Sequence, residues 1–92
     1  MKLNAYTIHD SASGVYSRPF FAQADGAAVR EFSDIANSKE HPVGKHPEHY
    51  KLFRTGIFNE TTGELTPEIL EHLANGHDLV EPSPQQDLKL AQ

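Results

Sequence analysis

The segment from Asp25 to Asn37 most constrains the fold, because its apolar residues recur at helical spacing. These residues are Ala28, Val29, Phe32, Ile35 and Ala36. A stripe of this kind is typical of a helix with one buried face. Asp25 is predicted to cap the first turn, and Asn37 is predicted to end the helix in a left-handed conformation. The helix is therefore expected to lie on a sheet, with Phe32 as its buried anchor.

Two strands are predicted before this helix. In residues 2–9, both sets of alternate side chains include apolar residues. This pattern is typical of a strand whose two faces are at least partly covered. Residues 10–14, Asp-Ser-Ala-Ser-Gly, are typical of a tight turn. Residues 15–22 then form a second strand, paired with the first as a hairpin. Pro19 lacks a backbone donor, so this strand is either an edge strand or is broken there.

Two more strands are predicted after a loop at residues 38–47. Pro47 can open one helical turn through Tyr50. The apolar residues that follow do not all fall on one face of a regular strand. A bulge at Gly56 would shift the face of the residues after it and so restore the alternating pattern. Residues 59–63, Asn-Glu-Thr-Thr-Gly, form a hairpin connection. Residues 64–65 are expected to return as a short fourth strand.

A second helix is predicted from Thr66 to Asn75. Thr66 is a candidate N-cap, Pro67 suits the first helical position, and Glu68 lies near the positive end of the helix. Ile69, Leu70, Leu73 and Ala74 would form one apolar face, and Asn75-Gly76 would end the helix.

Together these elements predict an α+β fold. The expected sheet is small, mixed and mainly antiparallel, with the elements in the order strand, strand, helix, strand, strand. One helix packs on a face of the sheet, and a short second helix follows. Residues 1–80 are expected to form a single domain, and residues 81–92 a flexible, acidic and proline-rich C-terminal tail.

Composition limits the stability and the location of such a domain. The 92 residues include no cysteine, so no disulfide or thiolate metal site can support a marginal core, and homo-oligomerisation is expected instead. No apolar run is long enough for a membrane span and no signal peptide is evident, so a cytosolic protein without membrane contact is predicted. The net charge of −5 is uneven, with +1 over residues 1–58 and −6 over residues 59–92.

The histidines and acids do not match a catalytic or metal-binding motif. His41, His46 and His49 lie in one loop, but their spacing matches no common zinc motif. No nucleophile elbow, phosphate-binding loop or paired-carboxylate motif is present. We therefore predict no enzyme activity, no metal site and no cofactor.

Single-stranded nucleic-acid binding is the sharper prediction. Such proteins combine aromatic side chains, on which bases stack, with a basic groove for the phosphates. Aromatic and basic residues lie close together in this sequence, although aromatic residues on strands also suit a core. The candidate nucleic-acid-binding residues are Arg18, Phe20, Tyr50, Lys51, Phe53 and Arg54.

The order of several short motifs resembles a known family. Ala5-Tyr6-Thr7-Ile8-His9-Asp10 is followed by Pro19-Phe20-Phe21 and by the segment from Asp25 to Asp34. His46-Pro47-Glu48-His49-Tyr50-Lys51-Leu52-Phe53 and Gly56-Ile57-Phe58-Asn59 come next, before Thr62-Gly63-Glu64. This order resembles the small nonstructural protein of gokushoviruses, single-stranded DNA phages of the microvirus group. The resemblance covers residues 3–66.

The sequence departs from this family at two positions. His49 and Asn59 stand where acids are commoner, which weakens any proposal that an acid there binds a metal. The resemblance implies a role in the host cytoplasm, in replication or packaging of the single-stranded genome. It implies a non-enzymatic accessory protein that binds single-stranded DNA, or alternatively an adapter that contacts replication or assembly proteins without touching DNA.

Overall fold

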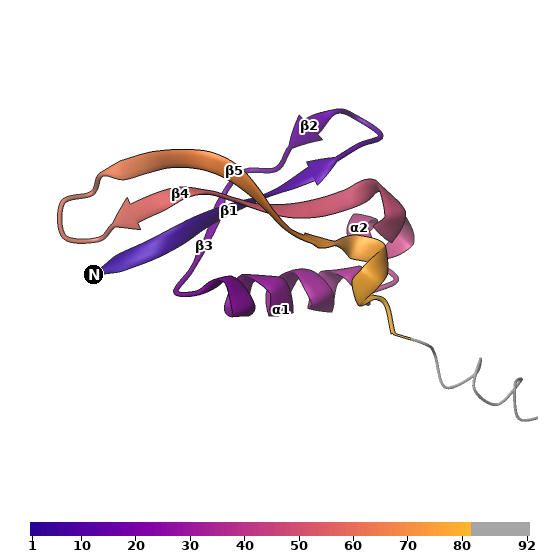
Figure 1. Ribbon diagram of the computed structural model, residues 1–92. Coiled ribbons are helices and arrows are strands. Elements are labelled where there is room, and N and C mark those ends of the chain that lie inside the picture. Colours follow the sequence, from indigo (N-terminus) through magenta and orange to yellow (C-terminus); the bar gives the residue numbers. More distant parts are fainter. Residues whose placement is uncertain (82–92) are drawn as a thin grey trace, which may run out of the picture.

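The computed structural model describes residues 1–81, in which one helix lies across a twisted antiparallel sheet (Figure 1). The strands are β1 (Lys2–Asp10), β2 (Val15–Tyr16), β3 (Phe20–Ala22), β4 (Tyr50–Asn59) and β5 (Leu65–Asn75). The helix is α1 (Asp25–Ala36). Shorter helical segments are α2 (Pro42–Lys45), η1 (Pro47–His49) and η2 (Gly76–Leu79).

β1 lies in the middle of the sheet and organises it. The strand order is β2-β1-β4-β5, and β3 pairs with β1 farther along the same edge as β2. β1 and β4 pair along their full lengths, from Lys2 opposite Asn59 to Asp10 opposite Tyr50. Each pairing among the described residues is antiparallel. The predicted α+β fold, with a mainly antiparallel sheet and one helix on its face, is confirmed.

The core lies between α1 and the sheet. Tyr6, Phe32 and Leu52 are fully buried and come from β1, α1 and β4. The predicted helix and its anchor Phe32 are therefore confirmed. Its ends differ from the prediction: the N-cap is Ala24, without a side-chain cap, and Asn37 has a φ of −96°, outside the left-handed region. Asp25 is committed to other partners, described below.

Several turn predictions hold. Gly14 and Gly63 have φ values of 76° and 77°, a conformation that glycine adopts without strain. The second strand is broken at Pro19 into β2 and β3. The register between β1 and β4 shifts so that Ala5 faces Gly56 while Tyr6 faces Arg54, which is the predicted bulge.

The predicted second helix at residues 66–75 is wrong, because this segment is strand β5. It pairs with β4 from Phe58 opposite Leu65 to Lys51 opposite Asn75. An isolated helix of about ten residues is marginal in water, whereas β4 offers a full row of backbone partners. Pro67 is tolerated because β5 is an edge strand and Pro67 lies opposite Gly56, where the register shifts. The short helix of the fold is instead α2, inside the segment predicted to be a loop.

Apart from Glu81, the predicted tail at residues 81–92 lies outside the described residues. No helix within residues 1–81 is long and apolar enough to cross a membrane.

Candidate nucleic-acid interface

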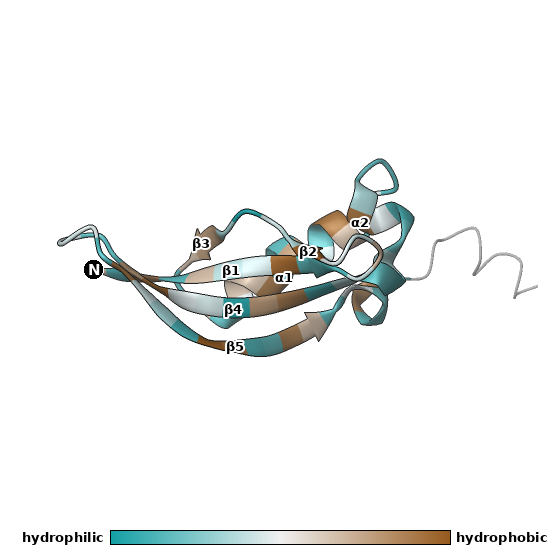
Figure 2. Ribbon diagram, turned by 90° about the horizontal axis from the view of Figure 1, so that it is seen from above, coloured by the Kyte–Doolittle hydropathy of each residue, from teal (hydrophilic) through white to brown (hydrophobic). Residues whose placement is uncertain are grey.

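The two faces of the sheet differ in what covers them (Figure 2). Along β1, Tyr6 and Ile8 pack into the core against α1. The alternate residues therefore point to the opposite side, which we call the outer face. Its β1, β4 and β5 members, by register and by contact, are Leu3, Ala5, Thr7, His9, Lys51, Phe53, Thr55, Gly56, Phe58, Leu65, Pro67, Leu70, His72 and Asn75.

A row of rings crosses the outer face from strand to strand. His9 of β1 lies 4.5 Å from Tyr16 of β2, measured between ring centroids. Tyr16 lies 5.9 Å from Phe53 of β4, edge to face, and Phe53 lies 5.4 Å from His72 of β5. We call these four residues the aromatic row. Toward the other end of the sheet, Phe21 and Phe58 form a separate pair at 5.4 Å.

An apolar groove of about 570 Å³ lies beside the aromatic row. It runs over β1, β4 and β5, and its lining includes Ala5, Thr7, Tyr16, Pro19, Leu65 and Leu70. Several of these side chains remain open to solvent, with 48% of Tyr16 and 44% of Leu70 exposed. Apolar side chains thus dominate the lining of this open groove.

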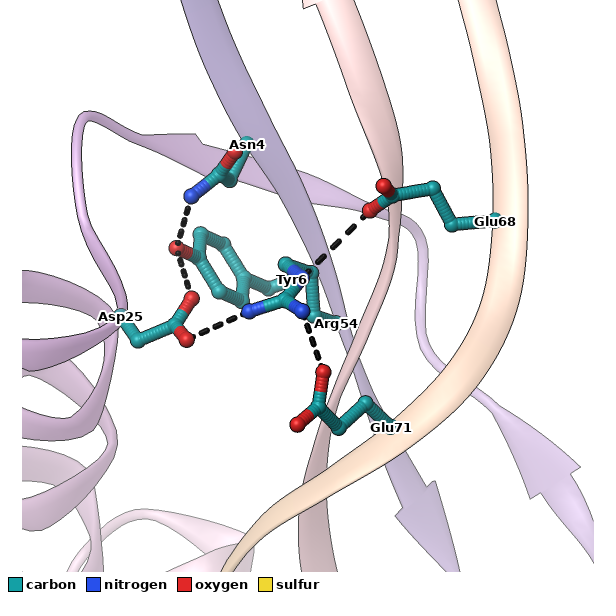
Figure 3. A network of polar contacts seen from close by, with 6 residues as sticks. All are labelled: Asn4, Tyr6, Asp25, Arg54, Glu68 and Glu71. Carbon is teal, nitrogen blue, oxygen red and sulfur yellow. Dashed lines mark hydrogen bonds and ion pairs between the residues drawn. The ribbon is translucent and has the colours of Figure 1, made fainter.

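The opposite side of the sheet carries a polar network centred on Arg54 (Figure 3). The guanidinium donates to Asp25 of α1 and to Glu71 of β5, and its Nε lies 3.4 Å from a carboxylate oxygen of Glu68. The Tyr6 hydroxyl donates to the second oxygen of Asp25 at 2.9 Å and accepts from the Asn4 amide at 3.1 Å. Arg54 thus ties the start of α1 to the edge strand β5.

This network shifts the ionisation of its members. Burial raises the pKa of the Asp25 carboxyl, but the hydrogen bonds from Arg54 and Tyr6 and the Arg54 charge outweigh burial, and the net pKa is lowered. The hydrogen bond to Asp25 raises the pKa of Arg54. Glu68 and Glu71 of β5 both contact Arg54 on the α1 side of the sheet. The outer-face positions of β1, β4 and β5 named above therefore include no acid.

The structure separates the six sequence-predicted site residues. Phe53 and Lys51 lie on the outer face, and Arg18 is exposed in the link between β2 and β3. Phe20 and Tyr50 pack against the core on the α1 side. Arg54 lies on that side as well, engaged by three carboxylates. Lys51 and Arg54 therefore do not share a face.

Sequence reasoning missed Tyr16, Phe21, Phe58, His9 and His72 as members of the outer face. Alternation along β1 indicates two sets of residues but not which set faces the helix. The choice between Phe20 and Phe21 depends on the register of β3 against β1, where Ala5 faces Phe21. His72 was missed because its segment was predicted to be helical.

The fold and this face define a small antiparallel-sheet protein with one covered face and one open aromatic face. Residues 3–79 match the family described as Phage ORF5 protein, and the chain belongs to this family. It is thus a phage protein. Neither the comparison with curated proteins nor that with solved structures gave a match.

Proposed function

We propose that this phage accessory protein binds single-stranded DNA across the outer face of its sheet, during replication or packaging of a genome of the gokushovirus type. Asn75 links the His72 end of the aromatic row to the Asp78 carboxylate, to which its amide donates at 2.9 Å. The observation that carries the proposal is the aromatic row itself, on a face whose named strand positions hold no acid. It revises the residue set expected from the sequence: Phe53, Lys51 and Arg18 remain, and Tyr16 and His72 join them.

The aromatic row supports stacking of unpaired bases. Its rings lie on the paired strands β1, β2, β4 and β5, so they are held by backbone pairing and not by loops. Nearly half of Tyr16 is exposed, and its ring lies between His9 and Phe53. Stacking of one base on an aromatic side chain contributes about 1–3 kcal/mol and tolerates any base. Binding without strong sequence preference is therefore expected.

Lys51 on this face, and Arg18 between the groove-lining residues Ser17 and Pro19, support weak phosphate contacts. Lys51 is exposed beside His9 in the register, and Arg18 is exposed near the start of β3. Two cations on a protein with a net charge of −5 predict a small electrostatic contribution to binding, which falls as salt rises. Stacking would then supply most of the affinity at higher salt.

A titration of labelled single-stranded oligonucleotide at several salt concentrations tests the proposal. We expect saturable binding at low salt and a shallow salt slope. Tyr16→Ala should weaken binding roughly 5- to 150-fold, equivalent to losing one stacked base. Lys51→Gln should weaken binding to all sequences and reduce the salt slope by about one.

Lys39→Gln is the matched control for charge, because Lys39 is exposed in the turn after α1 and away from the outer face. It should leave the salt slope unchanged. Absence of binding at low salt, or equal losses in Lys51→Gln and Lys39→Gln, would contradict the proposal.

A second function is favoured by the groove rather than by the rings. Its apolar lining, with Pro19, Leu65 and Leu70, suits the side chains of a protein partner. In that case the chain is an adapter for replication or assembly proteins. Leu70→Gln would then abolish partner binding, while the protein would show no affinity for oligonucleotide at any salt concentration.

A further inference from the structure

Three potential metal ligands meet in the short segment that joins α2 to β4. Nδ1 of His46 and Nε2 of His49 each lie 3.8 Å from Oε1 of Glu48. The three ligand atoms all lie within 4.8 Å of one another. The two imidazole rings are stacked, with centroids 5.5 Å apart. This cluster belongs neither to the outer face nor to the Arg54 network.

The donor set matches what zinc takes in proteins. Two histidines and one glutamate are a known ligand set for sites that keep a fourth position open. Zinc–ligand distances of 2.0–2.2 Å in a tetrahedron place ligand atoms about 3.4 Å apart. The two histidine–glutamate distances need to close by only about 0.4 Å. The histidine nitrogens lie within 4.8 Å of each other, and rotation of these solvent-accessible side chains brings them to the spacing that zinc needs.

The backbone beneath the ligands is already fixed. The His49 amide donates to the His46 carbonyl at 3.0 Å, and the His49 carbonyl accepts from Ser11 at 2.8 Å. Pro47 restricts the backbone between the two histidines. Gly76 of η2 packs so closely that an added Cβ would lie 2.5 Å from the Pro47 carbonyl oxygen. The turn is therefore held from two sides, which lowers the entropic cost of collecting the ligands.

The histidine spacing alone matched no common zinc motif, and Glu48 did not enter that comparison. The glutamate completes the set, since one of its carboxylate oxygens lies 3.8 Å from a nitrogen of each ring. The three ligands come from one local turn, which the contacts with Ser11 and Gly76 hold in place.

We propose that His46, Glu48 and His49 bind one divalent transition-metal ion, zinc in the first place, with water in the remaining position. The bound ion replaces the long, solvent-exposed contacts of Glu48 with the two histidines. It cross-links η1 and so fixes the entry into β4, the strand that carries Lys51 and Phe53.

Calorimetric titration of the full chain, prepared without a histidine tag, with zinc chloride tests the site. We expect one zinc per chain and a zinc-dependent rise in melting temperature, since an ion that binds only the folded state stabilises it. His46→Ala and His49→Ala should each weaken binding at least tenfold. Cobalt(II) should occupy the same site and give visible absorption bands that are absent in both variants.

His77→Ala is the matched control, because His77 is an exposed histidine 3.0 Å from a carboxylate oxygen of Asp78 but belongs to no three-ligand group within residues 1–81. It should bind zinc as the unaltered chain does. Melting curves without zinc establish that each variant is folded. Failure of the unaltered chain to bind zinc saturably, or equal weakening in His77→Ala and His46→Ala, would overturn the proposal.

Discussion

The contacts of Arg54 gather carboxylates on the α1 side of the sheet. It lies on the α1 side with three carboxylates around it, and two of those carboxylates come from β5. Salt bridges at a surface contribute little individually. A guanidinium that joins a helix to an edge strand has a larger structural effect, because it contacts carboxylates of both elements at once.

Replacing Asp25 tests this network through its dependence on pH. The pKa of Asp25 is lowered in the folded chain, so its contribution to stability is complete above the ordinary value of 3.8 and is lost as pH falls through the folded value. Asp25→Asn should therefore be less stable than the unaltered chain at about pH 7, and the difference should shrink at about pH 3. Urea unfolding at both pH values measures this.

Asp34→Asn is the control for the Asp25 variant, because Asp34 is exposed on the same helix. It should cost little at either pH. A stability loss in Asp25→Asn that does not change with pH would show that the carboxylate charge is not what Arg54 recognises.

Phe32 is the residue on which the core most depends. It is fully buried between α1 and the sheet. Phe32→Ala should lower the free energy of unfolding by about 3–5 kcal/mol, from lost apolar contacts and the cavity left behind. A domain of this size has little more than that to lose, so circular dichroism at room temperature should show a largely unfolded chain. A cooperative melt close to that of the unaltered chain would contradict the assignment of Phe32 to the centre of the core.

At the scale of elements, the sequence predicted correctly those parts whose signals are local. The stripe around Phe32 and the turns at Gly14 and Gly63 depend on neighbouring residues only. The segment at residues 65–75 carries an equally good helix pattern, yet it pairs with β4. Its strand state comes from a partner strand, which a local pattern does not contain. The candidate site was predicted only in part for the same reason, since the face of each aromatic residue depends on strand register.

The strand state of residues 65–75 can be checked by nuclear magnetic resonance. Cross-strand Overhauser contacts are expected between Phe53 and His72, and between Lys51 and Asn75, which are partners in the register. A helix would instead give contacts between residues three and four apart within the segment. Finding the second pattern in the folded protein would refute the β5 assignment.

Gly56 makes the bulge and the close approach of β5 possible. A Cβ added there would lie 2.6 Å from the Thr66 carbonyl oxygen, so the backbone of β5 must move. Gly56→Ala should cost about 1–3 kcal/mol of unfolding free energy. Gly26→Ala makes the same change in α1, where the added methyl group meets no atom of another element within 4 Å. This variant should gain up to about 1 kcal/mol of unfolding free energy. Urea unfolding of both variants measures the contrast, and equal effects would contradict it.

At the scale of the whole molecule, charge and apolar surface are separated by the sheet. The acids of β5 lie toward α1, while Tyr16, Leu65 and Leu70 remain exposed on the outer face. A net charge of −5 therefore coexists with a face on which the named outward positions of β1, β4 and β5 hold no acid. The clustered charges thus lie on the α1 side of the sheet, and the exposed apolar side chains lie on the outer face.

The central position of β1 has a consequence for synthesis of the chain. β1 leaves the ribosome before its long partner β4, which begins at Tyr50 and ends at Asn59. The core residue Leu52 arrives with it. Pairings between distant segments are slow because the loop between them must close first. We therefore expect β4 and β5 to form their hairpin first and to join β1 afterwards, and nascent chains that end before β4 to remain unfolded.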